Sequence, residues 1–347
     1  MAPHNPKLPS IDPRDLIACH GQQALGDLIA ETGYVIQRRL LTDLKHVLSS
    51  GKPWLIEGPR GGGKTALAEA VAQACNLPCF YLQGMQGLSL DDVLYSWDRE
   101  GQNQWVRQAT SSGKSLSEAR GAQWSREYLI LGEALGAFDF ASQDDITPVL
   151  IVDEADKLQE HIEDMLLQVL GRGWAHVPRF GDIGIRDGGK WPVVILLSND
   201  IRHDLSPPLR SRCVYSWLEP PTPREEVQIL RARVSAASPN LLAEVVKIIN
   251  CIRGIGGVTD KPGLRESIDL LTALVKHQPI TWSAELIDEH LCFLGKRNKD
   301  RANLEKGVAR LLQAVRLPHP EIDNWVEAAC ARFSSPLNKS EEPYDNK

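Results

Sequence analysis

One eight-residue segment, Gly58-Pro59-Arg60-Gly61-Gly62-Gly63-Lys64-Thr65, matches the pattern G-x-x-x-x-G-K-[ST] in full. In such a loop, glycines let successive backbone N–H groups turn toward a phosphate that bulkier residues would keep away. Lys64 can reach the β- and γ-phosphates, and Thr65 can offer its hydroxyl to Mg²⁺. Ala66 lies in a predicted helix whose positive dipole end faces the anion. The pattern predicts a site for ATP and Mg²⁺, the alternative being a chance Gly-rich turn.

Two adjacent carboxylates, Asp153 and Glu154, follow the apolar run Val149–Val152. Such a run indicates a strand buried on both faces, and parallel sheets bind ligands at the carboxyl ends of their strands. We expect Asp153 to hold Mg²⁺ together with Thr65, and Glu154 to polarise the attacking water. The alternative is a solvated loop in which Asp156 caps a helix. The 88-residue distance from Thr65 to Asp153 predicts an extra strand and an insertion between them.

Other polar residues can complete a hydrolytic site. Asn199 follows the apolar run Val193–Leu197, where its side chain can hydrogen-bond the attacking water or the γ-phosphate. The alternative is a turn-forming asparagine. Arg265 follows Pro262-Gly263 at the start of an apolar helix, from which it can close on the γ-phosphate.

Two arginines, Arg210 and Arg212, lie within Leu209–Cys213. If this segment is helical, residues two apart point about 200° apart, so only one of the two can enter a neighbouring site. An arginine delivered in trans stabilises the charge of the transition state of phosphoryl transfer. Surface salt-bridging is the alternative for each arginine.

Alternating strands and helices must position these residues. Apolar runs predict strands at Trp54–Glu57, Cys79–Leu82, Val149–Val152 and Val193–Leu197, and periodicity predicts helices at 22–50, 66–75, 89–98, 126–138 and 158–170. This alternation indicates an α/β fold with a parallel sheet. Residues at about 84–142 are predicted to be an insertion. Residues 174–191 are predicted to form a hairpin, with turns at Gly181-Asp182 and Asp187-Gly188-Gly189.

Prolines in Glu219–Pro223 mark a linker, and beyond it the chain shows helical periodicity and no convincing strand. Four parts are therefore predicted. They are an extended N-terminal arm (1–20), a nucleotide-binding domain (21–222), a smaller all-helical domain (223–333) and a disordered tail (334–347).

Composition and charge restrict the function further. The chain of 347 residues is 42% hydrophobic and 24% charged, which argues against a disordered or fibrous protein. Its net charge of −6 disfavours nucleic acid as a partner. Seven scattered cysteines suit a reducing compartment. No apolar run approaches the ~18–20 residues that span a bilayer, and no signal pattern opens the chain. We expect a cytoplasmic protein.

Taken in order, the motifs resemble those of the AAA+ superfamily over roughly residues 20–330. Gly58–Thr65 is similar to Walker A, Val149–Glu154 to Walker B, Asn199 to sensor 1 and Arg265 to sensor 2. The resemblance implies an ATPase with a three-layer αβα domain followed by a helical lid.

Two further segments carry the same resemblance. Leu209–Cys213 is similar to the Ser-Arg-Cys finger of clamp-loader relatives, which favours Arg212 over Arg210 as the arginine finger. Gly33-Tyr34-Val35 is similar to the segment that lines the adenine pocket, so Tyr34 and Val35 are expected there.

A narrower resemblance is to the MoxR family and its CoxD-like branch. It is carried by Leu82–Leu88, Leu94–Trp97, Arg212–Trp217 and Lys261–Gly263. The insertion and the hairpin fit that family's helix-2 and pre-sensor-1 insertions. The resemblance implies a hexameric ring, a partner that bears a von Willebrand factor A domain, and remodelling or activation of a client protein, often by assisting metal-cofactor insertion.

Three rival functions stay open. A DNA-linked AAA+ ATPase of clamp-loader or branch-migration type is favoured by Leu209–Cys213 but disfavoured by the net charge of −6. A P-loop kinase for a small molecule would need no arginine in trans. A nucleotide-gated scaffold with negligible turnover would have no use for Glu154.

Overall fold

The computed structural model describes residues 9–185, 189–199 and 205–334. The chain divides into two compact units. The N-terminal unit runs to Leu218, and the C-terminal unit begins at Glu219. Two short segments, Gly33–Val35 and Gly61–Gly63, belong with the C-terminal unit.

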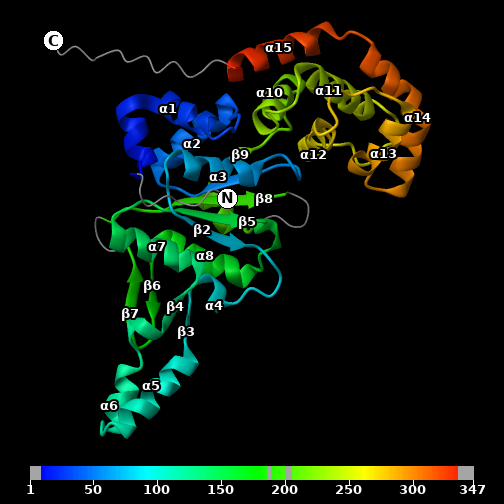
Figure 1. Cartoon of the computed structure of the whole chain (residues 1–347). Helices are drawn as coiled ribbons and strands as arrows, with labels where there is room; N and C mark the ends of the chain where they lie inside the picture. The colour runs from blue at the N-terminus through cyan, green and yellow to red at the C-terminus, as the bar shows by residue number, and fades with distance from the viewer. Residues whose placement is uncertain (1–8, 186–188, 200–204, 335–347) are drawn as a thin grey trace, which may run out of the picture. The chain divides into compact units, whose positions relative to one another are not determined.

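A five-stranded parallel sheet forms the centre of the N-terminal unit (Figure 1). Its strands are β1 (Trp54–Glu57), β2 (Cys79–Gln83), β5 (Val149–Asp153), β8 (Val193–Ser198) and β9 (Val214–Trp217), in the order β2-β5-β8-β1-β9. The continuous apolar runs of β1 and β8 are buried along their whole length, as expected of strands covered on both faces. Because the strands are parallel, β1 and β5 deliver the residues that follow them to one edge of the sheet.

Helices cover both faces of this sheet. They are α1 (Pro13–Glu31), α2 (Arg38–Ser50) and α3 (Lys64–Ala74) on one face, and α7 (Glu133–Asp144) and α8 (Glu160–Arg172) on the other (Figure 1). Apolar side chains of α7 and α8 share one buried core with the strands. The predicted three-layer αβα arrangement with a parallel sheet is therefore confirmed, and β2 is the extra strand expected between Thr65 and Asp153.

The start of the chain differs from the prediction. Helix α1 begins inside the predicted extended arm of residues 1–20, because the Asp12 side chain accepts the backbone N–H of Arg14 and caps the helix. The helical stretch predicted over 22–50 is confirmed except at residues 32–37, where the chain leaves α1 before it enters α2. Apolar residues continue across the break, so periodicity alone did not mark it.

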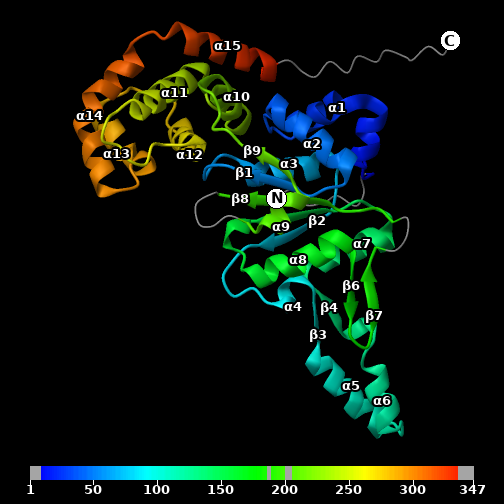
Figure 2. The same cartoon turned by 180° about the vertical axis from the view of Figure 1, so that it is seen from behind.

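The predicted insertion contains short elements that sequence patterns did not resolve. They are α4 (Leu90–Val93), β3 (Tyr95–Trp97), α5 (Arg99–Ser111), α6 (Leu116–Ala122), η1 (Arg126–Tyr128) and β4 (Leu129–Leu131). The helices predicted at 89–98 and 126–138 are only partly confirmed: α4 lies within the first range and α7 begins within the second, but β3 and β4 pair as an antiparallel ribbon over other residues of both ranges. Strands of three residues are too short to show a period. Helices α5 and α6 extend from this ribbon away from the central sheet (Figure 2).

A second antiparallel ribbon consists of β6 (Trp174–Val177) and β7 (Gly181–Gly184). The turn predicted at Gly181-Asp182 is wrong, because both residues pair within the ribbon. The chain turns instead at residues 178–180, where Arg179 takes a left-handed conformation with φ of 70°. The other predicted turn, at 187–189, falls mostly on residues outside those described.

The C-terminal unit has a helical core of its own. Its helices are α10 (Pro223–Arg233), α11 (Pro239–Arg253), α12 (Leu264–Val275), α13 (Ala284–Leu294), α14 (Asn298–Arg316) and α15 (Pro320–Ser334). No strand occurs in the part of this unit that the structure describes, in agreement with the predicted all-helical region. The predicted tail, apart from Ser334, lies outside the described residues. Among the described helices, none has the length and apolarity needed to cross a membrane.

Candidate active site

The phosphate loop connects β1 to α3, and its lysine is the first residue of that helix. The Lys64 ammonium is buried and donates to the carbonyl oxygens of Gly58 and Pro59, at 2.9 Å each. Burial lowers the pKa of Lys64, while the carboxylates of Asp153 and Asp156 act in the opposite direction. The ammonium therefore lies against the loop backbone and within electrostatic reach of the acids that follow β5.

The glycines of the loop adopt the backbone that the motif requires. Gly61 and Gly63 have φ of 72° and 93°, values at which a side chain would be strained. Gly62 is half-buried, Arg60 is exposed, and Ala66 is half-buried in the first turn of α3.

The predicted adenine segment lies beside this loop in the C-terminal unit. A Cβ added to Gly63 would lie 3.8 Å from the Tyr34 ring. Burial raises the pKa of Tyr34, with a smaller contribution from Glu225, so the phenol stays neutral. The next residue in the chain, Val35, is half-buried. Their roles toward adenine stay predictions.

The two predicted magnesium ligands lie together. Thr65 Oγ1 donates to Asp153 Oδ2 at 2.8 Å, and Tyr81 Oη donates to the same oxygen at 2.6 Å. The backbone N–H of Glu154 donates to Asp153 Oδ1 at 2.7 Å. A hydroxyl and a carboxylate suit Mg²⁺, which prefers oxygen ligands and takes its remaining ones from phosphates and water. The Thr65 hydroxyl and the Asp153 carboxylate therefore fit the Mg²⁺ ion that the phosphate-loop motif implies.

The predicted lytic carboxylate is held by two residues that sequence reasoning missed. Glu154 Oε2 accepts a hydrogen bond from Gln83 Nε2 at 2.7 Å and forms an ion pair with Lys157 Nζ. Gln83 ends β2 and pairs in register with Asp153. Both donors contact the Glu154 carboxylate and fix the direction of its side chain.

Gly84 allows a close approach of backbone at this point. Its N–H donates to the Asp153 carbonyl at 2.7 Å, and a Cβ at Gly84 would lie 2.2 Å from the Glu154 carbonyl oxygen. Glu154 itself has φ of 51°, a left-handed conformation uncommon outside glycine. The position of Glu154 thus depends on the absence of a side chain at residue 84.

Gly84→Ala is expected to lower ATP turnover by ~10- to 100-fold, because small displacements of a reacting group are costly. The measurement is steady-state phosphate release, with the melting temperature recorded in parallel. Gly121→Ala is the matched control, since a Cβ at that helical position meets nothing within 4 Å. If Gly84→Ala and Gly121→Ala turn over ATP at the same rate, the assignment of Glu154 as a lytic carboxylate positioned through Gly84 is contradicted.

Asp156 connects the ends of β5 and β8. Its carboxylate is buried, and Oδ1 accepts the backbone N–H of Asn199 at 3.2 Å. Oδ2 is also buried and has no hydrogen-bond partner among the residues that the structure describes. The alternative of a solvated loop with Asp156 as a helix cap is wrong, because Asp156 is buried and Gln159 is the N-cap of α8. The Asn199 side chain is half-buried, and its role stays a prediction.

The two arginines of α9 (Pro207–Arg212) have different surroundings. Arg210 forms an ion pair at 3.0 Å with Glu57, a carboxylate only 3% exposed at the end of β1. Arg212 is exposed and donates to the Pro208 carbonyl of its own helix. Arg210 is thus engaged by another element of its own chain, whereas Arg212 is exposed, and the finger role of Arg212 stays a prediction.

The N-terminal unit matches one family of known proteins. Residues 53–213 match the family model described as AAA domain, dynein-related subfamily. Residues 53–213 are an AAA domain. The AAA domain contains the phosphate loop, both acids, Asn199 and the α9 arginines, whereas Arg265 lies beyond the matched segment. A search of curated proteins found no match.

Proposed function

We propose that this protein is a MoxR-type AAA+ ATPase that hydrolyses ATP in a homo-oligomeric ring, expected to be a hexamer. The observation that carries hydrolysis is the hydrogen bond between Thr65 and Asp153, with Glu154 as the next residue. This contact joins the phosphate loop to the acids across 88 residues of sequence.

In the proposed mechanism, Lys64 and the loop N–H groups bind the phosphates. Thr65 and Asp153 hold Mg²⁺, which when bound neutralises charge on the transferred phosphoryl group. Glu154 accepts the proton of the attacking water, and Gln83 together with Lys157 keeps its carboxylate oriented.

Two features support the narrower MoxR assignment. The match to the dynein-related AAA subfamily is compatible with the resemblance. The two ribbons of the N-terminal unit also contact each other, because the rings of Trp97 and Phe180 are 6.4 Å apart and the Arg179 guanidinium lies 4.6 Å from the Trp124 ring. We propose that this combined surface binds a partner with a von Willebrand factor A domain or a client protein. The proposed role of the ATPase includes maturation of a metal cofactor in the cytoplasm.

Arg212→Ala should bind ATP normally but hydrolyse it ~10³-fold more slowly, because an arginine finger acts on the transition state. Mixing this variant with Glu154→Gln should restore part of the activity. A mixed ring contains interfaces that pair an intact Glu154 with an intact Arg212 from the next subunit. The measurement is phosphate release across a series of mixing ratios.

Subunit exchange must be shown in the same mixtures, by mass measurement of labelled subunits. If exchanging subunits never complement, Arg212 acts within its own subunit or only on structure. If Arg210→Ala complements instead, the ring model is retained and the arginine finger is Arg210, not Arg212. Stimulation of turnover by DNA would favour the clamp-loader or branch-migration alternative.

A further inference from the structure

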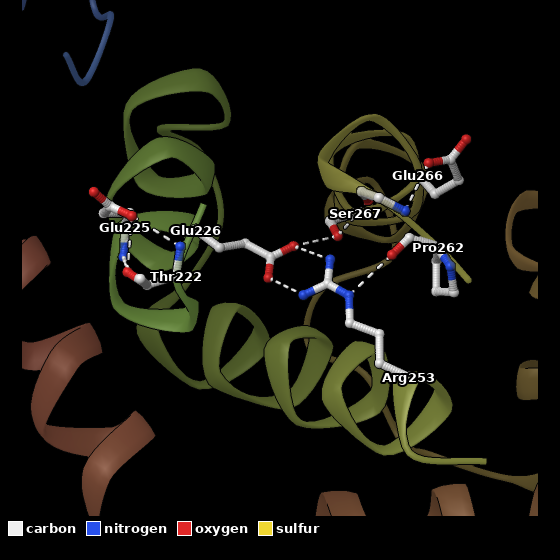
Figure 3. Close-up of polar contacts among 8 residues, drawn as sticks. Thr222, Glu225, Glu226, Arg253, Pro262, Glu266 and Ser267 are labelled. Atoms are coloured by element: carbon white, nitrogen blue, oxygen red, sulfur yellow. Dashed lines mark hydrogen bonds and ion pairs between the residues drawn. The ribbon is translucent and has the colours of Figure 1, made fainter. Parts of the chain in front are cut away.

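An ion pair between a buried carboxylate and a half-buried arginine lies where three helices of the C-terminal unit meet (Figure 3). Glu226 on α10 is fully buried, and Arg253 is the last residue of α11. The guanidinium contacts both carboxylate oxygens, with Nη1–Oε2 and Nη2–Oε1 distances of 2.6 and 2.9 Å. This paired geometry fixes both direction and distance, which a lysine in place of Arg253 could not do.

Both members of the pair also bind the start of α12. Arg253 Nε donates to the Pro262 carbonyl at 2.9 Å, just before the helix begins. The Ser267 hydroxyl lies 2.6 Å from Glu226 Oε1 and 3.0 Å from the Gly263 carbonyl oxygen. The ion pair therefore holds the chain on each side of the first turn of α12 (Figure 3).

The first turn of α12 carries Arg265. Its side chain is exposed, and a positive charge near a helix N-terminus opposes the helix dipole. The arginine is thus not placed there to stabilise the helix. A Cβ added to Gly61 would lie 3.6 Å from Arg265 Cβ, which puts this turn beside the phosphate-loop segment of the same unit.

We propose that Glu226, Arg253 and Ser267 are positioning residues that fix Arg265 for its action on bound ATP. The inference rests on the proposed ATPase function and on the sensor 2 role of Arg265. A buried ion pair is by itself weak evidence for stability, whereas its hydrogen bonds to Pro262 and Ser267 connect it directly to the turn that carries Arg265.

Ser267→Ala tests the proposal against a close control. Thr272 lies on the same helix, and its hydroxyl, like that of Ser267, lies within hydrogen-bond distance of the carbonyl oxygen four residues earlier, but Thr272 is exposed. Ser267→Ala should lower kcat about tenfold, the loss of one hydrogen bond to a charged group, with KM unchanged. Thr272→Ala should leave both constants at the wild-type values.

A double mutant separates positioning from general stability. In an Arg265→Ala background, Ser267→Ala should cause no further loss of kcat, because residues that act through one another are not additive. Arg253→Lys should reproduce the kcat loss of Ser267→Ala. Hydrogen exchange of a peptide spanning residues 262–270 should be faster in Ser267→Ala than in Thr272→Ala, and this readout needs no turnover.

The outcomes distinguish the inference from the function on which it rests. Wild-type protein without turnover would refute the proposed ATPase, and unchanged exchange at 262–270 would still refute the positioning cluster. If Arg265→Ala lowers kcat but Ser267→Ala does not, only the cluster is refuted. Multiplying losses in the double mutant would also refute it, since Ser267 would then act independently of Arg265.

Discussion

Glu154→Gln is expected to lower ATP turnover by ~10²–10⁴-fold while ATP binding is retained. Glutamine keeps the size and polarity of the side chain, but it cannot accept the proton of the attacking water. The variant also loses the charge that pairs with Lys157, yet the phosphate loop and the Thr65–Asp153 contact remain. An ATP-bound oligomer should therefore accumulate, measurable as retained nucleotide and as mass.

Glu160→Gln is the control for this variant, because Glu160 is an exposed carboxylate in the first turn of α8. It should turn over ATP at the wild-type rate. Normal turnover in Glu154→Gln would move the lytic role to another residue. Asp156 would be the next candidate, since it is buried and its charge acts on the pKa of Lys64.

Much of the fold could be predicted because the central strands are continuous apolar runs. Val149–Val152 and Val193–Leu197 predicted β5 and β8 to within one residue at each end. β9 carries Ser216 and Trp217 in a less apolar segment and was not predicted as a strand. Pairing with β1 makes that segment a strand, so tertiary context decides there and local sequence does not.

The candidate site likewise has residues that the sequence could predict and residues that it could not. The phosphate loop and the acids that follow β5 are short motifs whose chemistry depends on adjacent residues, so sequence could predict them. Tyr81, Gln83 and Arg210 were missed or left open because their partners lie 71 to 153 residues away in the chain. Only the strand order β2-β5-β8-β1-β9 brings these partners together. Polar residues at the end of β2 were the one signal that could have pointed to them.

The central claim is that Gly58–Thr65 binds the phosphates of ATP, and Lys64→Ala changes the residue on which that claim depends most. In the structure, Lys64 Nζ donates to the Gly58 and Pro59 carbonyl groups. In the complex with ATP it should donate to the β- and γ-phosphates. Two hydrogen bonds to charged groups contribute about 1.5–3 kcal/mol each, so the loss of affinity should be at least ~100-fold.

Isothermal titration of ATP with Mg²⁺ into the wild type, Lys64→Ala and Lys52→Ala is the most direct measurement. Lys52 is an exposed lysine just before β1, so its variant tests the effect of losing one surface charge. Tight binding by the wild type and Lys52→Ala, with no measurable heat from a folded Lys64→Ala, is the predicted result. ATP affinity unchanged in Lys64→Ala would contradict the phosphate-loop assignment and the proposed ATPase function that rests on it.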